Sequence, residues 1–245
     1  MMCEQNLIVS GHQPAYLPWL GLLHKASLCD IFIYMDDVQF IDRDYIHRNR
    51  VVTPNGKILW LTVPIDRKNS VSNIINDVKI AINNSVGDWQ RKHLLTLQAC
   101  YGKATYFKKY WPFFEWLYLD NKWEKITDID LIILKQTFEW FNLSPRLIIA
   151  SKEGFGGKKS DLILEHALRF KASKVITGIK GCDYINYEDF SANNVIVTHQ
   201  DYKHPKYSQG FEYNITHLSF IDLLFRYGPD CTSMAFNDNI DRQSL

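Results

Sequence analysis

The segment LIVSGHQPAYLPWLGLLHKASLCDIFIYM, residues 7–35, decides the fold class of this chain of 245 residues. Apolar residues concentrate at 6–10 and again at 31–35, which predicts two buried strands. Between them, the two prolines of GHQPAYLPWLG favour a loop, and residues 17–28 favour a helix. Because a strand, loop, helix and second strand in this order are typical of parallel α/β units, we predict an α/β protein with a Rossmann-like, mostly parallel sheet.

Other patterns follow this unit. Two strand patterns flank Pro54-Asn55-Gly56, and because Asn-Gly favours a tight turn, we predict a β-hairpin there. Apolar residues then recur at helical spacing, which predicts an inserted helical block at about 88–142. The α/β pattern resumes afterwards, with strands expected at 146–150, 174–178 and 195–199 and helices at 160–171 and 217–227. We therefore predict one α/β domain over residues 1–232, with a loose polar tail at 233–245.

Composition excludes several classes of protein. Hydrophobic residues make up 46% of the chain, so a large core can be buried. The 28 Lys and Arg residues are balanced by 27 Asp and Glu residues, which argues against a protein that coats DNA. The 5 cysteines form no C-x-x-C pair and their number is odd, so neither a disulfide framework nor a zinc site is expected.

The same features bear on location. Free thiols fit a reducing cytoplasm, and the N-terminus lacks the pattern of a signal peptide. The apolar stretches are shorter than the roughly 18–20 residues that a transmembrane helix needs. We therefore expect a cytoplasmic protein without a transmembrane segment, and its oligomeric state is left open.

The densest group of candidate site residues is GHQPAYLPW, residues 11–19. It follows a predicted strand, and loops at the carboxyl ends of parallel strands are where α/β sheets bind ligands. His12 suits acid–base chemistry, and Gln13 offers an amide group. Tyr16 and Trp19 offer ring faces to a sugar or a base. The alternative is a rigid, proline-bracketed turn with a hydrogen-bonded histidine.

Two acidic residues and a nearby glutamine end the second strand. Asp36 and Asp37 repel one another unless a cation or a substrate amine compensates, which makes them candidate catalytic groups beside Gln39. Because neighbouring side chains in a strand point to opposite faces, we expect one of the two aspartates to face the site. The alternative is one solvent-facing aspartate and one that caps a turn.

Basic residues follow a few positions later. Arg48 and Arg50 have planar guanidinium groups that suit phosphates and carboxylates, and Asn49 lies between them. The alternative is an exposed basic strand that pairs with nearby acids. The segment GGKKSD, residues 156–161, lacks the spacing of a phosphate-binding P-loop and favours an ordinary capped helix.

Two later loops repeat the mixture of polar and aromatic residues. They are TGIKGCDY, residues 177–184, and HQDYKHPKYSQGF, residues 199–211, and each follows a predicted strand. We expect substrate contacts from Gly178, Asp183, Tyr184, His199, Gln200 and Tyr207. Because carboxyl ends of parallel strands share one edge, we predict that one cleft gathers His12, Asp37, Arg48, Asp183 and His199. The alternative scatters them as unrelated turn and surface residues.

Several of these segments resemble one known family. HQPAYLPWLG, DIFIYMDDVQFIDRDYIHRNRV and WLTVPI resemble the opening of WbqC-like proteins, and TGIKGCDYI, HQDYKHPKYSQ and LSFIDLLFRYG are similar to that family's later blocks. The resemblance covers most of the chain apart from the helical block. A weaker resemblance joins G-H-Q-P to the nucleotidylyltransferase-like fold, although the second histidine of the H-x-G-H pattern is missing here.

The family resemblance implies a setting in O-antigen and other lipopolysaccharide biosynthesis. It implies a transferase or ligase that transfers glycine or a similar activated amino acid to the amine of a nucleotide-linked amino sugar. The cofactor stays unknown, with ATP and magnesium as one option, and no metal ligands are assigned. The alternative is a non-catalytic protein of the same pathway that binds the nucleotide sugar or acts as a scaffold.

Overall fold

A computed structural model describes residues 6–68, 70, 72–81 and 88–245. Five parallel strands form its central sheet, in the order β7-β2-β1-β8-β9. Numbered by their appearance in the chain, these strands have the order 3-2-1-4-5, which is that of a Rossmann fold. The predicted Rossmann-like α/β fold is therefore confirmed. The strands are β1 (Ile8–His12), β2 (Ile31–Tyr34), β7 (Arg146–Ile149), β8 (Lys174–Gly178) and β9 (Ile196–Gln200).

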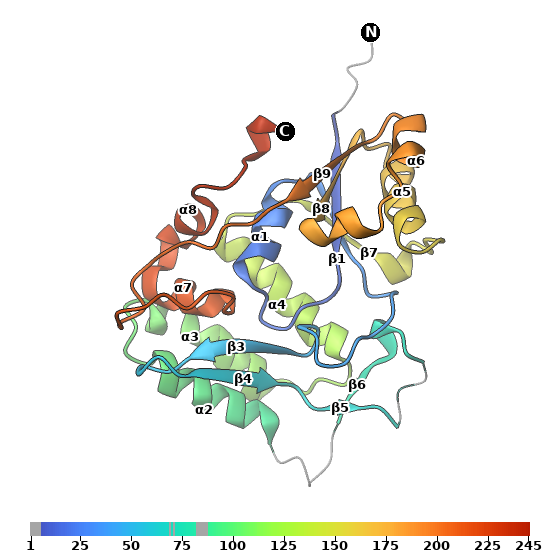
Figure 1. Ribbon diagram of the computed structural model, residues 1–245. Coiled ribbons are helices and arrows are strands. Elements are labelled where there is room, and N and C mark those ends of the chain that lie inside the picture. Colours follow the sequence, from blue (N-terminus) through green and yellow to red (C-terminus); the bar gives the residue numbers. More distant parts are fainter. Residues whose placement is uncertain (1–5, 69, 71, 82–87) are drawn as a thin grey trace.

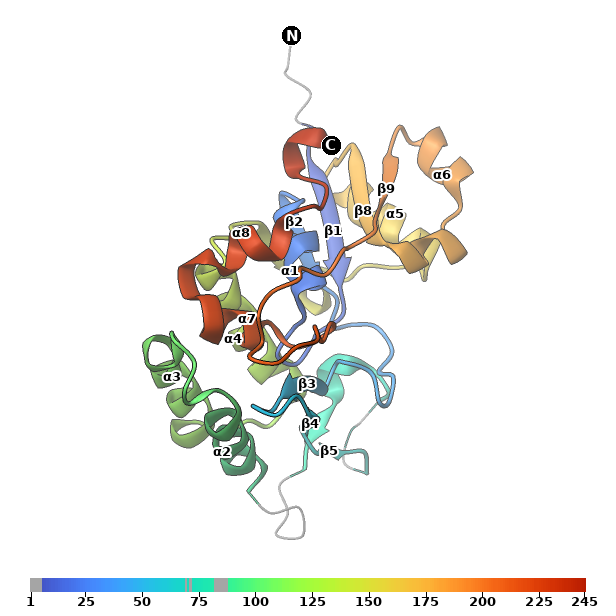
Figure 2. The same cartoon turned by 60° about the vertical axis from the view of Figure 1, so that its left-hand side comes forward.

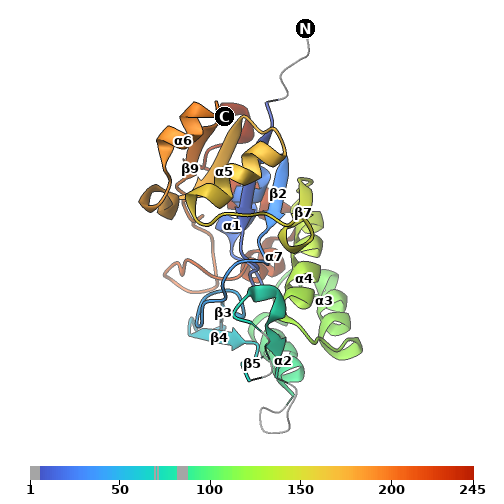
Figure 3. The ribbon, with the colours of Figure 1, turned by 90° about the vertical axis from the view of Figure 1, so that its right-hand side faces the viewer.

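Helices cover both faces of the sheet (Figure 1). Because side chains alternate along a strand, Phe32 of β2 joins the core beneath α1, α4 and α7, whereas Ile33 joins the core beneath α5 and α6. Figure 3 looks onto the α5 side of the sheet. The α-helices are α1 (Leu20–Ser27), α2 (Trp89–Tyr101), α3 (Phe107–Glu115), α4 (Ile126–Trp140), α5 (Ser160–Arg169), α6 (Tyr187–Ala192), α7 (Phe220–Tyr227) and α8 (Cys231–Phe236).

Two small antiparallel hairpins lie beyond the carboxyl edge of the sheet (Figure 1). The first joins β3 (Arg48–Val52) to β4 (Ile58–Thr62), as the Asn-Gly signal predicted. Gly56 has a φ of +79° in the connecting turn, a conformation that favours glycine. The second joins β5 (Ile65–Asp66) to β6 (Lys79–Ile80).

Helices fill the segment predicted to be a helical block. Asp88 begins α2, and its side chain accepts a hydrogen bond from the backbone N–H of Arg91 at 3.0 Å. The last helix of the block, α4, packs directly on the sheet, with the rings of Phe138 and Phe32 centred 5.7 Å apart. The described residues also form short 3-10 helices at Ile75–Asp77, Ala150–Lys152, Ile179–Asp183, Gly228–Asp230 and Arg242–Ser244, and a π-helix at Trp116–Asp120.

The C-terminal residues differ from the loose tail expected at 233–245. They return to the amino edge of the sheet, beside the start of β1 (Figure 2). Arg242 donates to both carboxylate oxygens of Asp30 at 2.7 Å. The backbone carbonyl of Ile240 accepts a hydrogen bond from Nε2 of His24 at 2.9 Å. These contacts hold the polar tail against the domain, which the composition of the tail does not predict.

The helices within the described ranges are all too short or too polar to cross a membrane.

Candidate functional site

A cleft of about 740 Å³ opens at the carboxyl edge of the sheet, where β1 and β8 end side by side. The chain leaves β1 through α1 on one face of the sheet, and it enters β8 from α5 on the other. This is the topological switch point, the place where Rossmann-like sheets bind ligands. Its volume is in the usual range for small-molecule sites, roughly 300–1,000 Å³. The cleft is therefore the candidate functional site.

His12 is the last residue of β1 and lines this cleft. Its Nδ1–H donates to the carbonyl oxygen of Gln13 at 2.8 Å, so Nε2 carries the free lone pair. Burial, together with the smaller effect of the nearby charge of Lys25, lowers the pKa of His12 to about 3. The imidazole is therefore neutral at physiological pH and able to accept a proton, although so low a pKa makes it a weak base.

Lys25 of α1 is the group in the cleft that sequence analysis missed. Its side chain is 6% exposed, and its Nζ donates to the carbonyl oxygen of Gly11 at 2.8 Å. Within the described residues, no carboxylate lies at ion-pair distance from this ammonium group. Burial lowers the pKa of Lys25 to about 8. The feature of the sequence that could have identified Lys25 is its position in the mostly apolar stretch LGLLHKA, residues 20–26.

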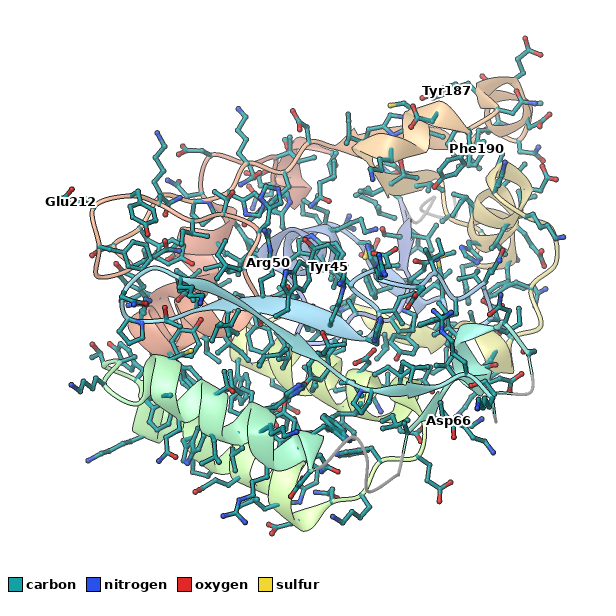
Figure 4. All side chains as sticks on the ribbon, turned by 60° about the horizontal axis from the view of Figure 1, so that its bottom comes forward. Tyr45, Arg50, Asp66, Tyr187, Phe190 and Glu212 are labelled. Carbon is teal, nitrogen blue, oxygen red and sulfur yellow. The ribbon has the colours of Figure 1, made fainter. Side chains whose placement is uncertain are left out.

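Aromatic rings extend from the cleft toward the first hairpin. The edge of His12 meets Trp19 with ring centroids 5.0 Å apart, and Trp19 lies 5.2 Å from Tyr45. The ring centroid of Tyr45 lies 5.8 Å from that of Trp60. The guanidinium groups of Arg48 and Arg50 lie over the ring of Trp60. Tyr45 and Arg50 are labelled in Figure 4, and the Arg50 guanidinium lies 5.7 Å from the ring centre of Trp60. Trp19 and Tyr45 both line the cleft, so two ring faces are available to a ligand.

Two further histidines line the cleft from the C-terminal segments. The rings of His204 and His217 are centred 4.0 Å apart. Burial lowers the pKa of His204 to about 4, with added repulsion from His217 and Arg50. Neutral imidazoles at this position offer hydrogen bonds rather than charge. The segment 199–211 that the sequence predicts as part of the site contains His204 but not His217, and neither histidine was among the predicted site residues.

Two predicted site residues, Tyr16 and Asn49, instead hold the loop after β1 in place. Tyr16 is fully buried, and its hydroxyl is hydrogen-bonded to Nδ1 of His93 at 2.8 Å and to the hydroxyl of Tyr118. Asn49 is also fully buried, and its amide donates to the carbonyl oxygens of Tyr16 and Leu17. These residues do not line the cleft, although Gln13 and Trp19 from the same loop do.

The predicted acidic pair also lies outside the cleft lining. Asp36 is buried and accepts two hydrogen bonds from Ser151. Asp37 is half-buried, and burial raises the pKa of its carboxyl group. Gln39 is exposed and forms a backbone bridge with Ile74. This geometry favours the structural alternative for Asp36.

The two arginines of β3 are occupied by other contacts. The guanidinium of Arg48 lies 4.3 Å from the ring centre of Trp60 and donates to the carbonyl oxygen of Arg43. Arg50 donates to the carbonyl oxygen of His217 at 2.7 Å. Neither arginine lines the cleft, so its phosphate-binding role stays a prediction.

The later loops are divided between the cleft and its surroundings. Gly178, Tyr184 and Gln200 line the cleft, whereas Asp183 and His199 do not. His199 is hydrogen-bonded through Nδ1 to Thr177 at 2.7 Å and through Nε2 to Tyr187 at 2.6 Å. Tyr207 donates to a carboxylate oxygen of Asp222 at 2.8 Å and packs away from the cleft.

The prediction that five residues meet in one cleft is therefore wrong for four of the five. His12 lines the cleft, whereas Asp37, Arg48, Asp183 and His199 do not. His12 and His199 do lie at the same edge of the sheet, because β1, β8 and β9 are parallel. Among the described residues, no three acidic, histidine or cysteine side chains are arranged to hold a metal ion.

Comparison with known proteins agrees with the resemblance of the motifs. The chain is 26% identical over 222 residues to an uncharacterized protein of Mycobacterium tuberculosis, Rv1507c, a match that covers 89% of this chain and 93% of the relative. No solved structure matches the chain. The model of the WbqC-like protein family matches residues 13–234, which include the helical block and most of the cleft lining and begin one residue after His12. The chain therefore belongs to the WbqC-like protein family.

Proposed function

We propose that this WbqC-like protein is a small-molecule transferase or ligase of surface-polysaccharide biosynthesis. In this proposal it joins glycine or a similar activated amino acid to the amine of a nucleotide-linked amino sugar. The observation that carries the proposal is that one cleft at the switch point holds a neutral imidazole, His12, and a buried cation, Lys25, with no carboxylate partner in the described part of the chain. An anionic substrate with a reacting amine fits this pair of groups.

The proposed step is an acyl transfer. The amine nitrogen attacks the carbonyl carbon of the activated amino acid, and the bond to the leaving group breaks as the C–N bond forms. Nε2 of His12 takes the proton that the amine loses and passes it to the leaving group. An anion bound beside Lys25 offsets the positive charge that lowers the pKa of His12, so the substrate itself strengthens the base.

One observation favours a second candidate function. With a pKa of about 3, His12 in the free protein is a weak base, which suits a protein that binds a nucleotide sugar for a partner enzyme. The cleft, the ring faces of Trp19 and Tyr45, and the cation of Lys25 serve binding equally well.

A product assay separates the two functions. Purified protein is incubated with nucleotide-linked amino sugars, amino acids and ATP with magnesium, and products are followed by mass spectrometry. Aminoacyl transfer predicts a mass increase of one aminoacyl unit that disappears in His12→Ala. Tight binding of a nucleotide sugar without product across a broad panel would reject the transferase and favour the binding protein.

A further inference from the structure

Lys25 is a buried cation that has no counterion among the residues that the structure describes. Its side chain is 6% exposed, and the one hydrogen bond that its Nζ makes among the described residues goes to the carbonyl oxygen of Gly11. An ammonium group has three donors, so two remain for another partner. Burying an unpaired charge destabilises the folded state, so such charges occur chiefly at sites that bind a ligand or take part in a reaction. Two N–H donors of Lys25 thus have no partner among the described residues and can bind a ligand in the cleft.

The surroundings of Lys25 make room for such a ligand. Gly11 and His12 form the end of β1 beside it, and both line the cleft. At Gly178, the end of the neighbouring strand β8, no atom lies within 4 Å of the position that a Cβ would occupy. Lys180 also lines the cleft, two residues further along. The backbone at this edge is thus open to close approach by a ligand near two lysines.

In Rossmann-like sheets the loop after the first strand commonly binds phosphates, but the corresponding loop after β1 differs here from a glycine-rich phosphate loop. The loop after β1 contains two prolines, Pro14 and Pro18, which have no N–H to donate. Gly21, near the start of α1, is covered by the ring of Tyr202, whose Cδ1 lies 2.9 Å from the position of an added Cβ. This loop therefore offers fewer backbone amides to an anion than a glycine-rich loop does.

We infer that Lys25 is the oxyanion-binding group of the cleft and that it holds the diphosphate of the substrate beside His12. This inference deepens the proposed function, on which its choice of substrate rests. The ammonium group donates its two remaining hydrogen bonds to the oxyanion, and Gly11 keeps the third. Binding also places the negative charge next to the imidazole of His12, where it stabilises the protonated form after proton transfer.

The test uses isothermal titration calorimetry at pH 7 with three probes: inorganic pyrophosphate, UDP and glycine. Wild-type protein should bind pyrophosphate and UDP, and Lys25→Met should weaken both about 10-fold to 100-fold, as expected for a charged hydrogen bond. Lys108→Met, which removes an exposed lysine of α3, should leave both affinities unchanged. Methionine preserves the length of the apolar stem, and thermal unfolding checks that both variants are folded.

The outcomes are distinct. Equal affinities in wild type and Lys25→Met, or no binding of any probe by wild type, would overturn the oxyanion site. Binding of glycine alone that depends on Lys25 would support the site and assign it to a carboxylate, which overturns the diphosphate assignment. Lys25-dependent binding of UDP together with a negative product assay would leave the site intact and reject aminoacyl transfer.

Discussion

The carboxylate of Asp36 at the end of β2 accepts hydrogen bonds from the backbone N–H of Ser151, at 2.8 Å, and from its hydroxyl, at 2.7 Å. Ser151 follows β7, the neighbouring strand in the sheet, although 115 residues separate the two positions in the chain. The Asp36 carboxylate therefore links the ends of β2 and β7, which are separated in the sequence by the hairpins and the helical block.

Replacement of this carboxylate should destabilise the fold. Asp36→Ala leaves two donors of Ser151 without a partner, so we expect the free energy of unfolding to fall by about 1–3 kcal/mol. Ser151→Ala removes the hydroxyl and keeps the backbone hydrogen bond, so its effect should be smaller. Urea denaturation measures both. A stability of Asp36→Ala equal to that of wild type would contradict the structural role.

Asp130 of α4 should make stability depend on pH. Both of its carboxylate oxygens are buried without a hydrogen-bond partner among the described residues, and burial raises its pKa well above the usual range. The folded state therefore keeps the proton to higher pH than the unfolded state does. Stability is greatest below the unfolded pKa and falls as pH rises from there toward the folded pKa.

The substitution Asp130→Asn removes this titration. We expect the variant to be more stable than wild type at pH 7 and the difference to shrink toward pH 3, because the carboxyl group is then protonated in both states. Asp128→Asn, at an exposed position of the same helix, is the matched control. Denaturant unfolding from pH 3 to pH 8 provides the measurement, and parallel curves for wild type and Asp130→Asn would contradict it.

The pairing of the C-terminal tail should contribute modestly to stability. Nη2 of Arg242 donates to both carboxylate oxygens of Asp30 in a partly exposed ion pair, so we expect Arg242→Ala to cost about 0.5–1 kcal/mol. Arg169→Ala removes a similarly exposed i,i+4 pair with Glu165 on α5, in which one nitrogen contacts one oxygen, so it should cost less. Thermal unfolding compares the two variants, and the reverse order would show that the tail contributes little.

Substitutions at His12 and Tyr16 should affect activity and stability differently. If the proposed transfer is correct, His12→Ala should lower turnover about 10²-fold to 10⁴-fold while the protein stays folded. Tyr16→Phe removes a buried hydroxyl outside the cleft, so it should lower stability and leave turnover within a fewfold of wild type. Turnover of the folded His12→Ala variant at the wild-type rate would remove His12 from the mechanism.

The affinity of the cleft for pyrophosphate should decrease in alkaline solution. Burial lowers the pKa of Lys25 to about 8, so the free protein loses this cation as pH rises through that value. We expect wild-type affinity to fall between pH 7 and pH 9.5 and the weak affinity of Lys25→Met to change much less. Calorimetry at several pH values measures this difference. Identical pH profiles for the two proteins would contradict the assignment to Lys25.

Local patterns in the sequence determined the elements of this protein. Apolar runs predicted the strands that became β1 and β2, and Asn55-Gly56 predicted the first hairpin, because strand formation and tight turns depend on neighbouring residues. The alternation of strands and helices predicted the parallel sheet for the same reason. The distinctive motifs around His12 also identified the family that the comparison confirmed.

The tertiary structure alone decided which side chains meet. Lys25 is buried because α1 is covered on several sides, and a helical pattern does not show how many of its sides are covered. Tyr16 turns away from the cleft to join His93 and Tyr118, which the helical block supplies from about 80 to 100 residues away. Asp36 finds Ser151 through the order of the strands. Burial and hydrogen bonding at these positions depend on residues that are distant in the chain. The neighbouring residues in the sequence do not show which distant residue each side chain will contact.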